Sequence, residues 1–161
     1  MKALQIAASL AIAASVFAAR DGSAQTATQT VSYEVAAVDQ ISVSGSPSLV
    51  VNTATAGSGL TSASASGTYA VTTNGTGRKI TASLDTNMPS GVTLTVSLGA
   101  PTGATSAGTV TLSTTAQDVV TGITTVNQSG LSIGYGLSAT VAAGVVPAGN
   151  KTVTYTITAG A

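Results

Sequence analysis

One short stretch, VTLTVSLGA at residues 92–100, carries the clearest structural pattern in this sequence. Val92, Leu94, Val96 and Leu98 occupy every second position, and threonine or serine lies between them. Successive side chains of a β-strand point to opposite faces, so this pattern gives a strand with one apolar face and one polar face. The stretch is therefore predicted to be a strand whose apolar face covers a hydrophobic core.

The same period of two recurs along the chain after residue 24. No stretch there keeps the 3.6-residue apolar period of an amphipathic helix, and Thr and Val, which favour strands, are abundant. The alternating residues predict strands around positions 31–37, 41–43, 49–51, 69–71, 80–84, 92–98, 110–112, 131–141 and 153–159.

Turn residues separate these segments. TNGTG at 73–77 contains Asn-Gly, the strongest short-range hairpin signal, and is expected to join the strand around Tyr69 to the strand around Ile80. About eight or nine antiparallel strands, each apolar on one face, predict an all-β domain with a single β-sandwich, and a closed barrel is the lesser alternative. Loops are expected from Gly, Pro and Asn content at 85–91, 100–108, 127–130 and 142–150, and a low-complexity surface loop at 53–67.

The N-terminus has the pattern of a secretory signal peptide. Met1-Lys2 precedes the apolar run LQIAASLAIAASVFAA at 4–19, which is shorter than the roughly 20 residues of a membrane span. Gly22-Ser23-Ala24 is the preferred cleavage site, and a cut after Ala18 is the alternative. The sequence thus predicts a signal peptide at 1–24, a domain at 25–161, and a bacterial protein that is secreted or held at the cell surface. No transmembrane helix is expected in the mature chain.

The composition excludes several classes of function. The chain has no His and no Cys, which removes Ser-His-Asp and Cys-His catalysis and His- or Cys-ligated zinc. After cleavage three basic and four acidic residues remain, too few for nucleic-acid binding. Asp85 and Asn87 are oxygen donors, but in DTNMPSG they are expected to satisfy the backbone of a turn. We therefore expect no enzyme activity, no cofactor and no metal.

The low charge also bears on association. Charged residues make up 6 % of the chain, against about 25 % in ordinary soluble domains. Copies of such a surface repel one another weakly, which favours self-association or attachment to a surface. The low content of charged residues is equally well explained by compositional bias in a secreted protein.

The first mature segment, QTATQTVSYEVAAVDQISVSG at 25–45, contains a second regular alternation. Val31, Tyr33, Val35 and Ala37 share one face. The segment at 28–38 is either the first strand of its own domain or a strand donated to a neighbouring molecule, in which alternate side chains fill pockets. The sequence leaves both readings open.

The two chain ends resemble those of secreted bacterial fimbrial subunits. TATQTVSYEVAAVDQISVSG at 26–45, with Val35-Ala36-Ala37-Val38 in place of a V-x-A-x-V pattern, and the closing TVTYTITAGA at 152–161 are similar to the spore-coat-U-like and chaperone–usher pilin families. The resemblance implies an immunoglobulin-like or pilin-like sandwich. It also implies donor-strand exchange, with Val31, Tyr33, Val35 and Ala37 as the donated side chains.

These observations together predict a non-enzymatic structural subunit that forms a homo-oligomer or homopolymer, either a filament or a surface coat. The alternative is a monomeric adhesin or carbohydrate-binding module that binds a surface glycan or a host surface through its loops. An exposed aromatic cluster would favour that alternative. The four tyrosines are instead in phase with apolar neighbours and are expected in the core: Tyr33, Tyr69, Tyr135 and Tyr155.

Overall fold

The computed structural model describes residues 24–160, which belong to two separate units. Residues 24–34 are the described part of an N-terminal unit, and the second unit begins at Val35. The predicted signal peptide lies outside the described residues, except for Ala24.

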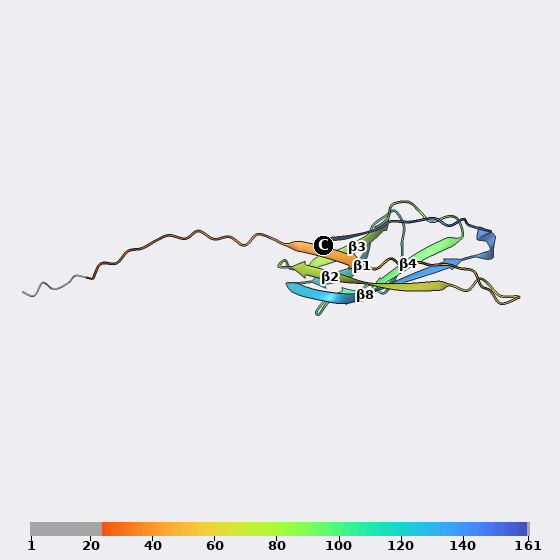
Figure 1. The fold of residues 1–161 in the computed structure, drawn as a ribbon, viewed down its shortest axis with the longest axis horizontal. Coiled ribbons are helices and arrows are strands. Elements are labelled where there is room, and N and C mark those ends of the chain that lie inside the picture. The colour runs from red at the N-terminus through yellow and green to blue at the C-terminus, as the bar shows by residue number, and fades with distance from the viewer. Residues whose placement is uncertain (1–23, 161) are drawn as a thin grey trace, which may run out of the picture. The chain divides into compact units, whose positions relative to one another are not determined.

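The second unit is a sandwich of two antiparallel sheets (Figure 1). One sheet has the order β1-β2-β8-β4-β6 and the other has the order β5-β7-β3-β9. The prediction of an antiparallel β-sandwich with eight or nine strands is confirmed. The strands are β1 Asp39–Ser44, β2 Ala63–Thr73, β3 Arg78–Leu84, β4 Val92–Leu98, β5 Thr105–Ser106, β6 Thr109–Thr111, β7 Gln117–Ile123, β8 Val126–Ala139 and β9 Val153–Ala159.

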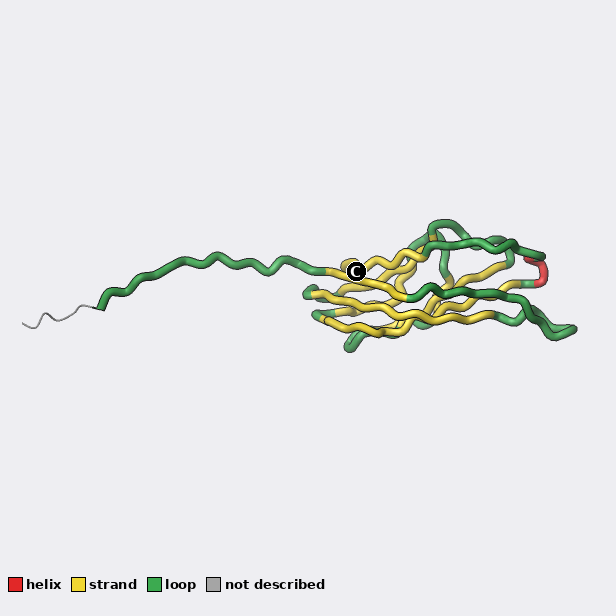
Figure 2. The backbone as a smooth tube through the Cα atoms, in the orientation of Figure 1, coloured by secondary structure: helices red, strands yellow, loops and turns green. Residues whose placement is uncertain are grey.

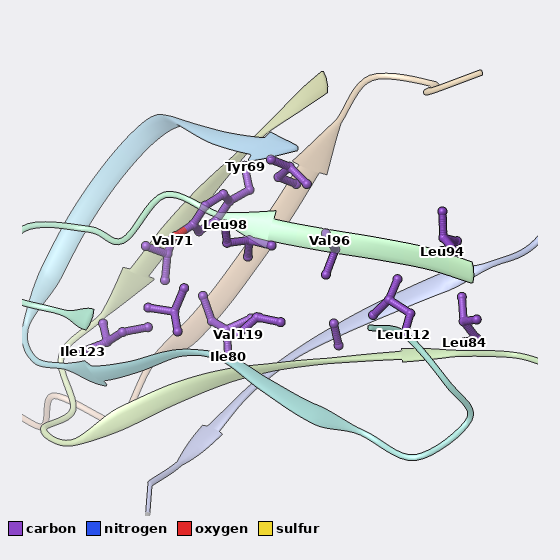
Figure 3. Close-up of a cluster of buried hydrophobic side chains, with 13 residues drawn as sticks. Tyr69, Val71, Ile80, Leu84, Leu94, Val96, Leu98, Leu112, Val119 and Ile123 are labelled. Atoms are coloured by element: carbon purple, nitrogen blue, oxygen red, sulfur yellow. The ribbon is translucent and has the colours of Figure 1, made fainter. Parts of the chain in front are cut away.

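The core lies between the two sheets and consists of the alternating apolar residues (Figure 3). In β4, Leu94, Val96 and Leu98 are buried, as their spacing predicts. They face Ile80 and Val119 from the opposite sheet, both of which are 0 % exposed. Burial of each such side chain contributes about 1.5–3 kcal/mol, so this two-layer arrangement is the main source of stability.

The Asn-Gly turn does not form the expected hairpin. It does connect β2 to β3, but β2 pairs with β1 and β8 in one sheet, whereas β3 pairs with β7 and β9 in the other. Tyr69 of β2 and Ile80 of β3 are both buried, one from each layer, so the turn carries the chain across the core. The burial of both apolar faces outweighs the local preference for a hairpin.

Three other local predictions are also corrected. The expected loop at 127–130 lies inside β8, where the pairing with β2 shifts register between Tyr69 and Val71. The low-complexity loop ends earlier than expected because β2 begins at Ala63, and residues 49–51 form no strand. β7 was not predicted from the sequence. A register shift against β3 makes two consecutive residues, Val119 and Val120, face the core, and this breaks the alternation of apolar and polar residues.

Helical structure is nearly absent from the described residues. A single 3₁₀ turn, η1 at Val141–Ala143, lies between β8 and β9 (Figure 2). No helix within residues 24–160 is long and apolar enough to cross a membrane.

Two tyrosines make the stability of the sandwich sensitive to alkali. Tyr69 donates a hydrogen bond to the Gly99 carbonyl at 2.6 Å, and burial raises its pKa from 10.0 to about 12. Burial, with the hydrogen bond that Tyr155 donates to Tyr135, also raises the pKa of Tyr155. The folded state therefore holds these protons more tightly than the unfolded state does.

Because a raised pKa favours the protonated folded form, its stabilising effect is complete below pH 10 and is lost as pH rises towards 12. We expect the melting temperature to stay level up to about pH 10 and then to fall steeply. Thermal unfolding followed by circular dichroism between pH 8 and 12 measures this. In the Tyr69→Phe variant the melting temperature should fall less steeply with pH above pH 10. An equally steep fall in that variant would contradict the role given to Tyr69.

Candidate self-association site

The predicted donor segment forms no strand in the structure. All residues from 24 to 38 are exposed, and the first strand begins only at Asp39. Val31, Tyr33 and Val35 are 75 %, 93 % and 86 % exposed. Within the described residues, the four donor candidates, Ala37 included, therefore present an apolar face that no strand covers.

Of the four tyrosines, Tyr33 is thus the one for which the core prediction was wrong. Tyr69 is buried, and Tyr135 and Tyr155 pack against the core. Tyr33 shares its spacing with apolar neighbours in the same way, but residues 24–38 belong to no sheet of the described chain. Alternation alone therefore does not determine burial.

The chain is fixed in place from Ala36 onward by the side chain of Asn74. Its Nδ2 donates to the Ala36 carbonyl at 2.8 Å, and the Val38 N–H donates to its Oδ1 at 2.8 Å. The Asn74 N–H donates to the Val38 carbonyl at 3.2 Å. The amide of Asn74 thus bonds to main-chain groups that a neighbouring strand would otherwise bond. The interpretation of Asn-Gly as a hairpin turn did not predict this role.

A charged cluster fixes the start of β1 next to this contact. Asp39 pairs with Arg78 at 3.2 Å and accepts a hydrogen bond from the Thr73 hydroxyl at 2.6 Å. Asp39 interrupts the apolar alternation of the opening segment because its carboxylate has these partners. The exposed segment and the sandwich strand are therefore separated at a defined residue.

One lateral side of the sandwich is closed by the chain itself. Residues 105–111 pass from β5 in one sheet to β6 in the other. The Ser106 hydroxyl donates to the Leu98 carbonyl at 2.6 Å, and the Ala107 N–H donates to the Val119 carbonyl at 3.0 Å. These bonds join the two sheets and cover the core on that side.

The opposite side is bounded by two edge strands, β1 and β9, which lie close to each other. Within residues 24–160 neither strand has a second pairing partner. The inward side chains Val153, Tyr155 and Ile157 of β9 are only partly buried, whereas Ile80 of neighbouring β3 is 0 % exposed. The core is therefore less completely covered along β9 than along β3.

The free edge of β9 offers regularly spaced main-chain groups. The Asp85 N–H donates to the Thr152 carbonyl at 3.0 Å, and the Gly160 N–H donates to the Gly77 carbonyl at 2.7 Å. Because hydrogen-bonded pairs alternate along an antiparallel ladder, the even-numbered residues of β9 bond to β3. The N–H and C=O groups of Val153, Tyr155, Ile157 and Ala159 then point to the unpaired edge. These four residues are the acceptor positions for an added strand.

A groove with a volume of about 820 Å³ lies where the chain enters β9. Residues 47–51 and 146–150 contribute to its lining, together with apolar side chains such as Leu60 and Met88. Lys151 is the one charged residue of the lining and precedes β9 by two positions. The groove thus has a mixed apolar and polar lining with a single charge, and it lies beside the beginning of the free edge.

The described residues bring together little titratable chemistry. Asp85 Oδ1 accepts the N–H groups of Thr86 and Thr152, and Asn87 Oδ1 accepts that of Thr114. Only the bond to Thr86 lies within the predicted turn, and the other two join this turn to distant segments. Within residues 24–160, no three Asp, Glu, His or Cys side chains are grouped as metal ligands. The site consists of exposed apolar side chains and unpaired main-chain groups.

No protein-family model matches this chain, and no curated protein or solved structure is detectably similar to it. The resemblance of the chain ends to fimbrial subunits therefore stays a prediction.

Proposed function

We propose that this protein is a secreted structural subunit that self-associates into a filament or surface coat. Residues 28–38 of one molecule add as a strand to the free edge of β9 in a neighbouring molecule. One observation carries the proposal: the same chain has an unpaired segment with an exposed alternating apolar face and a sheet edge beside an incompletely covered core.

The two surfaces match in period. Val31, Tyr33, Val35 and Ala37 recur every second residue, as do the four acceptor positions of β9 from Val153 to Ala159. In strand addition, main-chain hydrogen bonds supply affinity and alternate side chains supply specificity. Burial of Val31 and Val35 would contribute about 1.5–3 kcal/mol each, which is set against the entropy lost on association.

The edge strand lacks the features that usually prevent such pairing. Exposed edges are commonly protected by charged residues, proline or a bulge. The sequence of β9, VTYTITA, has no charge and no proline, and its pairing with β3 is regular. Its exposed side chains Thr154, Thr156 and Thr158 would not repel an approaching strand.

The alternative of a glycan-binding module lacks a corresponding observation. Sugar sites on such modules use exposed aromatic platforms, and among the described tyrosines Tyr33 alone is exposed. The chain has no Trp, and its single Phe falls in the predicted signal peptide.

Removal of the N-terminal segment tests the proposal. Deletion of residues 25–35 keeps Ala36 and Val38, which bond to Asn74, so the sandwich should retain its melting temperature. We expect filaments or large assemblies from the mature chain in negative-stain electron microscopy and dispersed monomers from the truncated chain. Dispersed mature chains, or assemblies of unchanged size from the truncated chain, would contradict the proposal.

A peptide of residues 25–37 provides the complementary test. Added to the truncated chain, it should bind the free edge of β9 and raise the melting temperature by an amount that grows with the logarithm of its concentration above the Kd, because a ligand stabilises the state it binds. A peptide in which Val31, Tyr33 and Val35 are replaced by serine is the matched control and should have no effect.

A further inference from the structure

The bonds made by Asn74 lie on one side of the segment. Its side chain accepts the N–H of Val38 and donates to the carbonyl of Ala36, both at 2.8 Å, and its own N–H donates to the Val38 carbonyl at 3.2 Å. These bonds continue the pairing of β1 with β2 beyond Asp39. Because successive residues of an extended chain point their main-chain groups to opposite sides, the N–H and C=O of Ala37 face away from Asn74. Asn74 therefore engages even-numbered residues and leaves the odd-numbered ones to face a new partner.

A strand added to β9 can run antiparallel or parallel to it, and the two directions use different main-chain groups of the segment. The odd-numbered residues of β9 offer their groups at the free edge, and the odd-numbered apolar residues of the segment have to face the core. In an antiparallel pair, opposite residues bond to each other, so the odd-numbered residues of the segment bond to β9. In a parallel pair, the residue opposite a bonding residue points its groups away, so the even-numbered residues would bond to β9 instead. Parallel addition therefore needs the groups of Ala36 and Val38 that Asn74 already holds.

The segment cannot add antiparallel to β9 of its own molecule. Arg78 pairs in register with Ala159, and its guanidinium bonds to Asp39 at 3.2 Å, so the anchored residues lie at the Ala159 end of β9. An antiparallel strand would have to bring Ala37 to the other end of β9, at Val153. That end is about 20 Å of extended strand away, whereas Ala37 lies next to two residues held by Asn74. Antiparallel addition therefore requires a second copy of the chain.

We propose that Asn74, through its bonds to the main chain, makes residues 28–38 add antiparallel to β9 of a second copy. This inference rests on the proposed function and specifies the geometry of its contact. The sandwich of the donating molecule then follows beyond Val153, at the end of β9 where the groove lies, so two different ends of the sandwich meet. A contact between different surfaces can continue as an open filament, whereas parallel addition brings two like ends together and closes a dimer.

Engineered disulfides measure the direction, because the chain has no cysteine of its own. When the apolar residues of the segment are aligned with the inward residues of β9, Ser32 lies opposite Thr158 in the antiparallel direction and opposite Thr154 in the parallel direction. Ala36 has the reverse expectation. In the antiparallel case both are pairs without main-chain hydrogen bonds, with Cα atoms about 4.5 Å apart, which a disulfide can span.

The links are formed between two mature chains that carry one cysteine each. Chains with Ser32→Cys are mixed with chains with Thr158→Cys or Thr154→Cys and oxidised. Trypsin then releases residues 152–161 as a separate peptide, since Lys151 precedes them, and mass spectrometry identifies its link to the donor peptide. We expect Ser32→Cys to link to Thr158→Cys and not to Thr154→Cys. The reverse result, or no link from assembled chains, would overturn the direction, whereas a mature chain that stays monomeric would overturn the proposed function as well.

The role of Asn74 is tested in the same experiment. Asn74→Ala removes both side-chain bonds to the segment, so the yield of the parallel link, Ser32→Cys with Thr154→Cys, should rise by about tenfold. Asn127→Ala is the matched control, since Asn127 is an exposed asparagine that bonds to Thr72 and not to the segment. A purely structural role of Asn74 would lower the melting temperature and leave the ratio of the two links unchanged. An unchanged ratio would overturn the role of Asn74 and leave the truncation result intact.

Discussion

An aspartate in place of Val35 is expected to abolish self-association and to leave the sandwich as stable as before. Val35 is 86 % exposed, so the folded monomer loses almost nothing when it is replaced. In the proposed assembly the same side chain enters the partly covered core beside β9. An unpaired carboxylate there costs several kcal/mol, and about 4 kcal/mol corresponds to roughly a thousandfold loss of affinity.

The control for this variant is Ser32→Asp. Ser32 lies on the other face of the segment, so the added charge should stay in water and change assembly by no more than a few-fold. Analytical ultracentrifugation over a range of concentrations compares the two variants, and circular dichroism checks their folding. Equal losses of assembly in both variants would mean that the charge of the segment matters and its alternation does not.

Replacement of Ile80 with alanine is expected to have the opposite effect, a large loss of stability. Ile80 is 0 % exposed at the centre of β3, between β7 and β9. Truncation of a buried isoleucine costs about 2–5 kcal/mol because transfer energy is lost and a cavity remains. This is a large fraction of the free energy of unfolding of a typical domain, about 5–15 kcal/mol. The melting temperature should therefore fall by roughly 10 °C.

Thr81→Ala is the matched control, since Thr81 is the next residue of β3 and faces outward. It should lower stability by less than about 1 kcal/mol. Urea unfolding of both variants in the Val35→Asp background keeps the chains monomeric during the measurement. A similar loss from both substitutions would contradict the core described between the sheets.

The strand content and the core were predictable from sequence because alternation is a local property. In β4 the period of two identifies Leu94, Val96 and Leu98 as inward residues without knowledge of any neighbour. The donor candidates were found by the same signal. The acceptor strand β9 could not be found in this way, because it has the same alternation as the other strands. Its free edge follows only from the order of the strands in the sheet.

Local signals failed where distant segments compete for pairing. Asn-Gly at 74–75 predicts a hairpin, yet β2 and β3 join different sheets because each buries an apolar face from its own layer. Gly130 and its neighbours predict a loop, yet pairing with β2 on both sides of them extends β8 through them. Short-range propensities amount to less than the burial energy of a whole strand face, so the tertiary arrangement prevails.

The segments 92–98 and 31–37 show most clearly what each level determines. Both alternate apolar and polar residues, and the sequence alone predicts that each can form a strand with one apolar face. In the structure the first is buried in β4 and the second is exposed and unpaired. A strand requires a partner for its main-chain groups and a layer to cover its apolar face. Whether a partner exists depends on the order of strands in the sheets, which only the tertiary structure decides.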